Sequence, residues 1–158
     1  MLFRSAKSDF AGAQAAYERA YALNPSDADL LADFGGFHNY LGKPDEAIRR
    51  IESAMRLNPL YSDWYLRLLA LAYFYVGNYA KAIEVVHRAR EPHAGLLRAL
   101  MAAHIMMGQP EQAEAARAEM MKLEPWFTIS TLRKGLPFKD PAFGEPYFTA
   151  LRKAGLPE

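Results

Sequence analysis

Four histidines are the first side chains to consider for chemistry, because a neutral imidazole can transfer a proton or hold a metal ion. They are His38, His87, His93 and His104. A zinc site needs three or four ligands, commonly with two histidines one helical turn apart, and no two of these histidines have that spacing. We therefore predict no metal site, and we interpret His38 and His104 as buried or half-buried members of a helical core.

The other candidates for acid, base or nucleophile also lack a catalytic pattern. The chain has no cysteine, no serine in a Gly-x-Ser-x-Gly setting and no glycine-rich phosphate loop. The carboxylates Asp27, Asp29, Asp33, Glu46 and Glu52 are expected in first helical turns or on solvated outer faces. We predict no catalytic residue and no cofactor, so this chain alone is not expected to be an enzyme.

Helices must position these side chains, because the apolar residues recur with helical spacing and no strand-like alternation stands out. A pattern of glycine, then proline or tyrosine two residues later, then alanine three residues after that begins at Gly42, Gly77 and Gly108. A degenerate copy spans 8–13. Glycine permits the positive φ with which many helices end, and proline fits the first turn of the next helix.

A second pattern, Leu-x-Pro, ends at Pro25, Pro59 and Pro125. Between the two patterns each unit has room for two helices of three to four turns. The glycines are 35 and 31 residues apart, which indicates an array of one small unit. Stacked units form an extended surface rather than an enclosed cleft, so this organisation favours binding over catalysis.

These patterns resemble the tetratricopeptide repeat (TPR), a helix-turn-helix unit that stacks into a right-handed superhelix. The small residue that this family places inside the first helix appears as Gly35 and Ala70. The resemblance covers residues 1 to about 125 and implies an all-α solenoid. The implied parts are a half repeat at 1–25, repeats at about 28–61, 63–92 and 94–125, and C-terminal capping helices at 126–158.

In this family the first helix of each unit lines a concave groove, and the resemblance transfers that role to particular side chains. The expected peptide-binding residues are Asp33, Gly36, Asn39, Tyr40, Trp64, Arg67, Leu71, Phe74, Tyr75, Arg98, Ala102, Ile105 and Met106. The large apolar groups among them would supply burial. Arg67 and Arg98 occupy equivalent places in successive units, where they could share one carboxylate of a peptide.

Two other interpretations of these side chains stay open. The aromatic residues could pack between units as core, or the chain's own last helix could fold back and occupy the groove. The Lys-Asn-Arg clamp that the family's chaperone-tail receptors use for a dicarboxylate is missing, because Ala32, Leu71 and Ala102 stand at positions that it needs.

The first unit contains only its second helix, expected from Asp9 to about Leu23. Its rings Phe10, Tyr17 and Tyr21 are expected to face a missing partner helix. One interpretation is that the chain is the C-terminal part of a longer protein. The alternative is a homodimer in which a second copy covers this half repeat.

The tail predicts one short helix that ends at Gly135 and a last helix capped by Asp140. The segments 136–141 and 151–158 resemble the extreme C-terminus of bacterial signalling proteins, in which TPR units follow a class III adenylate/guanylate cyclase domain or a winged-helix DNA-binding domain. This resemblance implies a regulatory role in signal transduction. The alternatives are a sensor or oligomerisation domain of a winged-helix transcriptional regulator and a stand-alone, self-associating scaffold.

The composition of the chain limits the kinds of partner that it is expected to bind. Nineteen basic and eighteen acidic residues give a net charge of +1, which offers no basic footprint for nucleic acid or for an anionic membrane. No apolar run approaches the roughly 20 residues of a membrane-spanning helix, and charges interrupt the N-terminal residues that a signal peptide would need. The absence of cysteine fits a reducing compartment. We predict a cytoplasmic protein with a protein or peptide partner.

Overall fold

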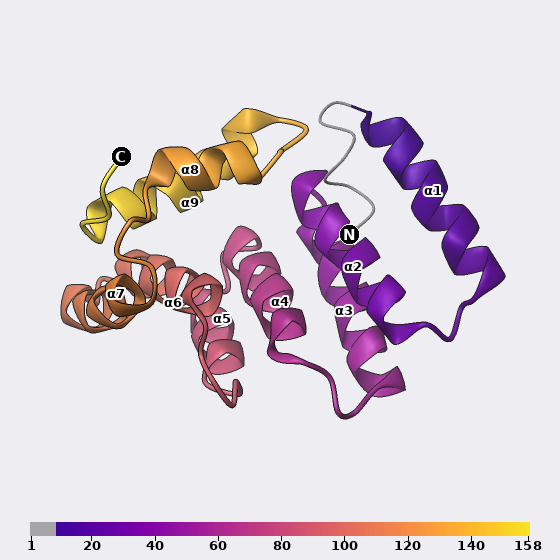
Figure 1. Cartoon of the computed structure of the whole chain (residues 1–158), viewed down its shortest axis with the longest axis horizontal. Helices are drawn as coiled ribbons and strands as arrows, with labels where there is room; N and C mark the ends of the chain where they lie inside the picture. The colour runs from indigo at the N-terminus through magenta and orange to yellow at the C-terminus, as the bar shows by residue number, and fades with distance from the viewer. Residues whose placement is uncertain (1–8) are drawn as a thin grey trace.

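The computed structural model describes residues 9–158, which fold into nine helices with no strand among them (Figure 1). The helices are α1 (Phe10–Leu23), α2 (Ala28–Tyr40), α3 (Pro44–Leu57), α4 (Asp63–Tyr75), α5 (Tyr79–Val86), α6 (Ala94–Met106), α7 (Pro110–Leu123), α8 (Ile129–Gly135) and α9 (Pro141–Lys153). The predicted all-α solenoid is confirmed. The first eight residues of the expected half repeat lie outside the described part of the chain.

Each of the pairs α2–α3, α4–α5 and α6–α7 turns at a glycine. The φ angle is 72° at Gly42, 78° at Gly77 and 68° at Gly108, a left-handed conformation in which a Cβ would be strained. Pro44 and Pro110 then begin α3 and α7, where the missing N–H has no partner to lose. The repeated sequence pattern therefore marks the turn inside each helix pair.

Helix α2 is in close contact with α3 and is hydrogen-bonded to α4. A Cβ added to Gly35 would lie 2.6 Å from Cγ1 of Ile51 and 3.2 Å from the carbonyl oxygen of Ala47, so α2 and α3 cross without room for a side chain there. The side-chain amide of Asn39 donates a buried hydrogen bond of 3.0 Å to the carbonyl oxygen of Leu68 in α4. Units are thus linked by a buried polar contact as well as by apolar packing.

Tyrosine hydroxyls bridge consecutive units through carboxylates. The hydroxyl–carboxylate pairs are Tyr17–Asp33 at 2.7 Å, Tyr65–Asp29 at 2.5 Å and Tyr73–Glu52 at 2.8 Å. Burial, together with the hydrogen bond to the carboxylate, raises the pKa of Tyr73 to about 12. Asp29 lies in the first turn of α2 and is exposed, as predicted, whereas Asp33 and Glu52 are half-buried; each of the three also accepts a hydrogen bond that links two helices, which the sequence did not predict.

Helix α1 packs its aromatic side chains inward against α2. The Tyr17 ring is buried, with its centroid 5.0 Å from that of Phe34 and 5.2 Å from that of Phe37. Phe10 stacks on Phe37 at 6.4 Å, and the Arg50 guanidinium lies 6.0 Å from the Tyr21 ring. The expectation that these rings face a missing helix is wrong for Tyr17, because its spacing along α1 turns it toward α2.

The third unit is shorter than the others, as α5 has 8 residues where α3 and α7 have 14. The chain after α5 is held by the carboxylate of Asp63, which accepts hydrogen bonds of 3.1 Å from the backbone amides of Arg90 and Glu91. This contact ties the end of the unit to the first turn of α4. Helix α6 then begins at Ala94, after this non-helical connection.

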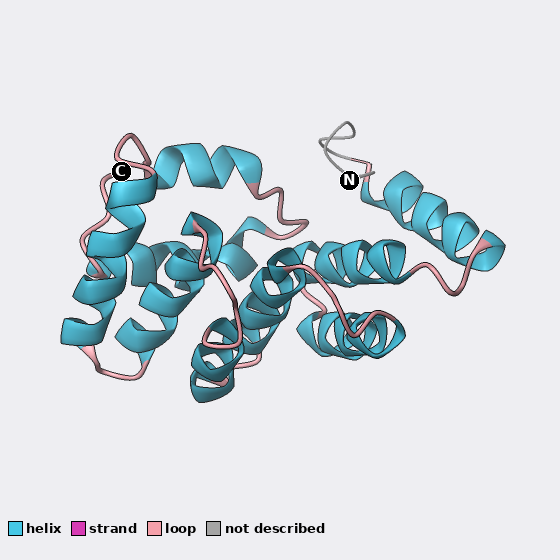
Figure 2. Ribbon diagram, turned by 60° about the horizontal axis from the view of Figure 1, so that its bottom comes forward, coloured by secondary structure: helices cyan, strands magenta, loops and turns pink. Residues whose placement is uncertain are grey.

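The tail folds into two helices, α8 and α9, which lie across one edge of the array (Figures 1 and 2). Asp140 caps α9 through the amide of Ala142, and Pro141 occupies its first turn, as predicted. The residues Tyr147, Phe148 and Leu151 are buried against the array. The amide of Ile129 donates 2.8 Å to the carbonyl oxygen of Pro157, so the start of α8 is held by the segment that follows α9.

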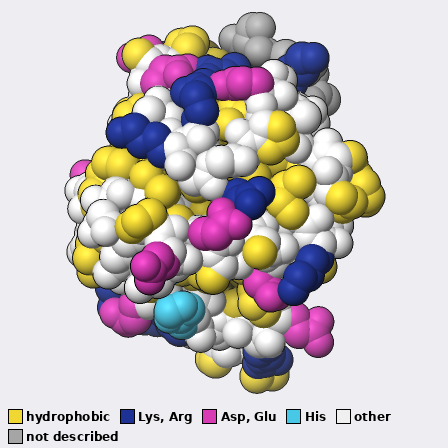
Figure 3. Space-filling model, turned by 90° about the vertical axis from the view of Figure 1, so that its left-hand side faces the viewer, with side chains coloured by type: hydrophobic (Ala, Val, Ile, Leu, Met, Phe, Trp, Pro, Cys, Tyr) yellow, Lys and Arg dark blue, Asp and Glu magenta, His cyan; other side chains and the backbone are white. Residues whose placement is uncertain are grey.

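Charges of both signs are dispersed on the face formed by the later helices and the tail (Figure 3). Most ion pairs on α3, α5 and α7 join residues one helical turn apart, such as Arg117 and Glu114 at 2.7 Å. Exposed pairs of this kind contribute little to stability. No helix within residues 9–158 is both long and apolar enough to span a bilayer.

Candidate peptide-binding groove and cavity

The residues expected to line the groove fall into two groups. The buried residues are Gly36, Asn39, Tyr40, Leu71, Phe74 and Ala102. Those that keep partial or full exposure are Asp33, Trp64, Arg67, Tyr75, Arg98, Ile105 and Met106. The buried members act in packing between helices, and the accessible members lie on α2, α4 and α6.

The tail covers the C-terminal ends of α2 and α4 with aromatic rings. The centroid of the Tyr75 ring lies 4.7 Å from that of Phe143, and the Phe74 ring lies 5.4 Å from that of Tyr147. Phe138 packs against Tyr40 at 5.6 Å. The backbone amide of Lys139 also donates 2.9 Å to the carbonyl oxygen of Tyr40. This end of the inner surface is therefore occupied by the chain itself.

Tyr75 has an unusual environment beneath the tail. Its hydroxyl is buried and has no hydrogen-bond partner within residues 9–158. Burial raises the pKa of Tyr75 well above its usual value. An unsatisfied buried hydroxyl is unfavourable, so the tail is held here by its rings and not by this polar group.

Arg98 forms contacts that were not predicted from the sequence. Its guanidinium forms an ion pair of 2.7 Å with Glu124 and lies 4.5 Å from the centroid of Phe127. The sharing of one external carboxylate by Arg67 and Arg98 stays a prediction, and Glu124 competes with that carboxylate for Arg98. The sequence held a signal for this, since the Leu-x-Pro pattern has Asn24 and Asn58 in earlier copies and Glu124 in the last.

A cavity of about 710 Å³ lies between the inner helices and α8. Its lining comes from α2, from α4, from the start of α6, from the end of α7 and from α8 with its flanking segments. The lining residues are Tyr40, Arg67, His93, Ala94, Gly95, Arg98, Glu124, Trp126, Phe127, Thr131, Leu132, Lys134, Gly135, Leu136 and Pro137. Three of them, Tyr40, Arg67 and Arg98, were predicted from the sequence, and the α8 side was missed because the tail matches no repeat.

His93 stands at the rim of this cavity, where it caps α6. Its Nδ1 accepts a hydrogen bond of 3.1 Å from the amide of Gly95. Burial lowers the pKa of His93, and the positive charges of Arg67 and Arg98 lower it further. The imidazole is therefore neutral near pH 7 and contributes an acceptor and an aromatic edge rather than a charge.

Replacing Arg67 with Met is expected to raise the pKa of His93 toward 6.5, because one of the two repelling guanidinium groups is removed while the burial stays. The titration of the imidazole Cε1 proton, followed by NMR, measures this value. Arg19→Met on α1 is the matched control and should leave the titration unchanged. An unchanged or lower His93 pKa in Arg67→Met would show that Arg67 does not act on this imidazole.

His38 and His104 are core histidines, as predicted. Nδ1 of His38 lies 2.7 Å from the carbonyl oxygen of Phe34, and Nδ1 of His104 lies 2.7 Å from Oε1 of Gln109. Burial lowers the pKa of His38. Both rings are buried and hydrogen-bonded within the helical core, although His38 also lines a hollow at the turn between α2 and α3.

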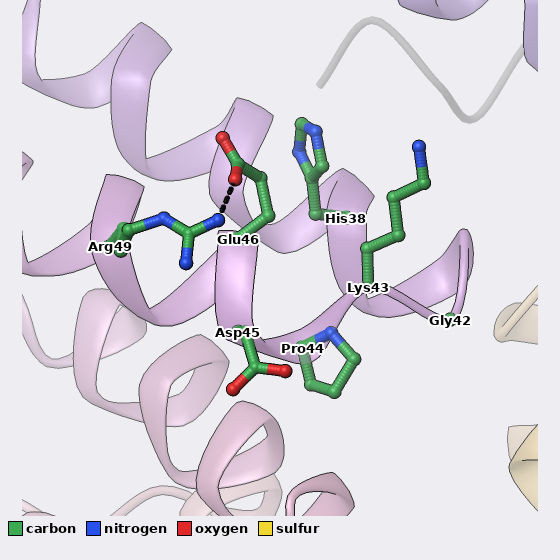
Figure 4. A pocket seen from close by; sticks show the side chains of 7 residues that line it. All are labelled: His38, Gly42, Lys43, Pro44, Asp45, Glu46 and Arg49. Carbon is green, nitrogen blue, oxygen red and sulfur yellow. Dashed lines mark hydrogen bonds and ion pairs between the residues drawn. The ribbon is translucent and has the colours of Figure 1, made fainter.

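A second hollow lies at the turn between α2 and α3, with a volume of about 470 Å³ (Figure 4). The charged groups around this hollow do not converge on a common point. Glu46 forms an ion pair with Arg49, and Asp45 points away from both His38 and Lys43. From Asp9 onward, no group of three His, Asp or Glu side chains could hold a metal ion. The cavity under α8 is the better candidate site.

Comparisons with known proteins give the fold. No family model and no curated protein matches the chain. Among solved structures, a crystal structure of MamA is 23% identical, covers 96% of this chain and 90% of its own, and has a TM-score of 0.68. TTC0263, a thermophilic TPR protein of Thermus thermophilus, is 22% identical, covers 92% and 77%, and has a TM-score of 0.67. The chain therefore has the fold of a TPR solenoid.

Proposed function

We propose that this protein is a binding module that holds a peptide segment of a partner protein on the inner surface of its helical array. The observation that carries the proposal is the cavity of about 710 Å³ between the inner helices and α8. That volume lies within the range of sites that bind small ligands, and it accommodates a few side chains of a peptide. Trp126 at its edge is 78% exposed, and tryptophan is enriched among the residues that dominate binding energy at interfaces.

The chemistry of the lining favours recognition over catalysis. It combines apolar and aromatic surface with fixed cations, and its carboxylate, Glu124, is bound to Arg98. Such a combination buries an apolar side chain and selects a polar neighbour. Proton transfer would need a free acid or base beside the bound group, and the neutral His93 is engaged by the Gly95 amide.

The tail is a second candidate occupant of the same inner surface. Its rings Phe138, Phe143 and Tyr147 contact aromatic residues of α2 and α4, which supports this assignment. We infer that the two occupants divide the surface. The tail takes the C-terminal ends of α2 and α4, and the partner segment takes the region around Trp64, Arg67 and the cavity.

Peptide selection against the full chain tests this function. Peptides enriched from a random display library should bind wild type, and Trp64→Ala and Trp126→Ala should each weaken binding by about tenfold or more. Fluorescence anisotropy of a labelled peptide measures the affinity, and circular dichroism checks that helicity is retained. Leu23→Ala, at an 87% exposed position at the end of α1, is the control and should bind normally. Selected peptides that bind both tryptophan variants as tightly as wild type would contradict the proposal.

The signalling context inferred from the tail stays a prediction. It rests on the resemblance of the last residues to the C-termini of cyclase-type and winged-helix TPR proteins. The coding sequence upstream of Met1 tests it directly, since a cyclase or winged-helix domain in the same reading frame is the expected result.

A further inference from the structure

The cavity under α8 has an excess of positive charge. The basic side chains Arg67, Arg98 and Lys134 line it together with one carboxylate, Glu124. Arg98 and Glu124 are paired at 2.7 Å. Within residues 9–158, no carboxylate lies within ion-pair distance of Arg67 or Lys134. Two cations of the lining therefore form no ion pair with a carboxylate of the described residues, although Asp63 stands one turn before Arg67 on α4.

The side-chain stem of Arg67 packs directly against Gly95 of α6. A Cβ added to Gly95 would lie 2.6 Å from Cδ of Arg67 and 3.0 Å from the His93 ring. The glycine thus leaves room for the arginine stem to pass along the first turn of α6. That turn carries the positive end of a 13-residue helix dipole, which adds to the field of the guanidinium.

The positive charges lie beside both the His93 imidazole and an apolar part of the lining. Arg67 and Arg98 help to lower the pKa of His93. Trp126, Leu132 and Leu136 form apolar lining next to these cations. A ligand that fits both parts carries a negative group adjacent to an apolar or aromatic side chain.

We propose that this cavity binds a carboxylate that is borne on an apolar or aromatic residue, with Arg67 as the main contact and Lys134 at the rim. The proposal rests on the function proposed above and names the chemistry of its ligand. A planar guanidinium forms two parallel hydrogen bonds with a carboxylate, a geometry that selects carboxylates over other polar groups. The carboxylate belongs either to a chain terminus or to an acidic side chain, and the test distinguishes these sources.

Three small probes test the proposal on the full chain by NMR. N-acetylphenylalanine carries a terminal carboxylate, N-acetylglutamyl-phenylalaninamide carries a side-chain carboxylate, and N-acetylphenylalaninamide carries none. One or both acidic probes should shift the Gly95 amide and the Trp126 indole signals, and the neutral probe should bind at least about tenfold more weakly. The amides of Gly77 and Gly108, in turns outside the cavity lining, serve as controls and should not move.

Two variants assign the effect to Arg67. Arg67→Met keeps the apolar stem and should weaken the acidic probe by about tenfold or more. Gly95→Ala keeps the charge but displaces the arginine stem, and it should also weaken binding. Arg19→Met on α1 should have no effect. The proposal is overturned if the neutral probe binds as well as both acidic ones, or if Arg67→Met binds the acidic probe normally.

The outcomes separate this proposal from the proposed function. Peptides that bind through Trp64 and Trp126 without any preference for a carboxylate would leave the binding module standing and remove the carboxylate site. Acidic probes that bind through Arg67, with no peptide enriched by display, would establish the carboxylate site and contradict the peptide-binding function.

Discussion

Replacing Phe148 with Ala is expected to lower the free energy of unfolding by about 3–5 kcal/mol, the usual loss for a large ring removed from a core. Phe148 is a residue of α9, is 1% exposed and belongs to the main hydrophobic core. Its ring contacts Phe138 and Tyr147 with centroid distances of 6.2 and 6.1 Å, and the Arg133 guanidinium of α8 lies 4.2 Å from it. One ring therefore joins α9, α8 and the segment that covers Tyr40 and Tyr75.

Chemical denaturation measures the loss, and hydrogen exchange locates it. The amides of α8 and α9 should lose protection before those of α3 and α4, because an array unfolds from the units that have fewest neighbours. Arg152→Ala, exposed on the same helix, is the matched control and should change stability by no more than about 0.5 kcal/mol. A loss below about 1 kcal/mol for Phe148→Ala would show that the tail is not anchored through this ring.

The repeat pattern predicted most of the fold because its punctuation is local. A glycine with positive φ and a proline in a first turn are preferences of one or two residues, so Gly42, Gly77 and Gly108 mark the turns from sequence alone. The tail helices were predicted for the same reason, since Asp140 and Pro141 form a local helix start. Local signals say where helices begin and end, and they carry less information on what those helices contact.

The candidate site was predicted only in part because it joins segments far apart in the chain. Arg67 and Arg98 were expected on the inner face, and both line the cavity. Glu124, Phe127 and Lys134 were not, because they come from the end of the last repeat and the segment after it: Glu124 and Phe127 contact Arg98 of α6, Lys134 lies on α8, and no repeat position encodes these placements. For Phe74 the structure favours the alternative of core packing that the sequence had left open, because Phe74 is buried and packs against Tyr147 of the same tail.

Replacing Tyr17 with Ala is expected to weaken the docking of α1 by about 3–5 kcal/mol. Tyr17 is the large buried side chain of α1, it stacks on Phe34 with an interplanar angle of 3°, and its hydroxyl donates 2.7 Å to Asp33. Because α1 packs mainly on α2, the loss should be local. Hydrogen exchange should show α1 unprotected while the amides of α4 to α7 keep their protection.

Tyr17→Phe separates the ring from its hydroxyl, because it keeps the stack on Phe34 and removes only the hydrogen bond to Asp33. The expected loss is about 1 kcal/mol, and α1 should stay protected. If Tyr17→Ala leaves α1 as protected as in wild type, the ring is not what holds this helix, and the contact of Phe10 with Phe37 must hold it instead. If Tyr17→Phe lowers stability as much as Tyr17→Ala does, the hydrogen bond to Asp33 contributes more than the ring stack. The carboxylate of Asp33 would then be left partly buried without a donor, and this would cost more than the lost ring contacts.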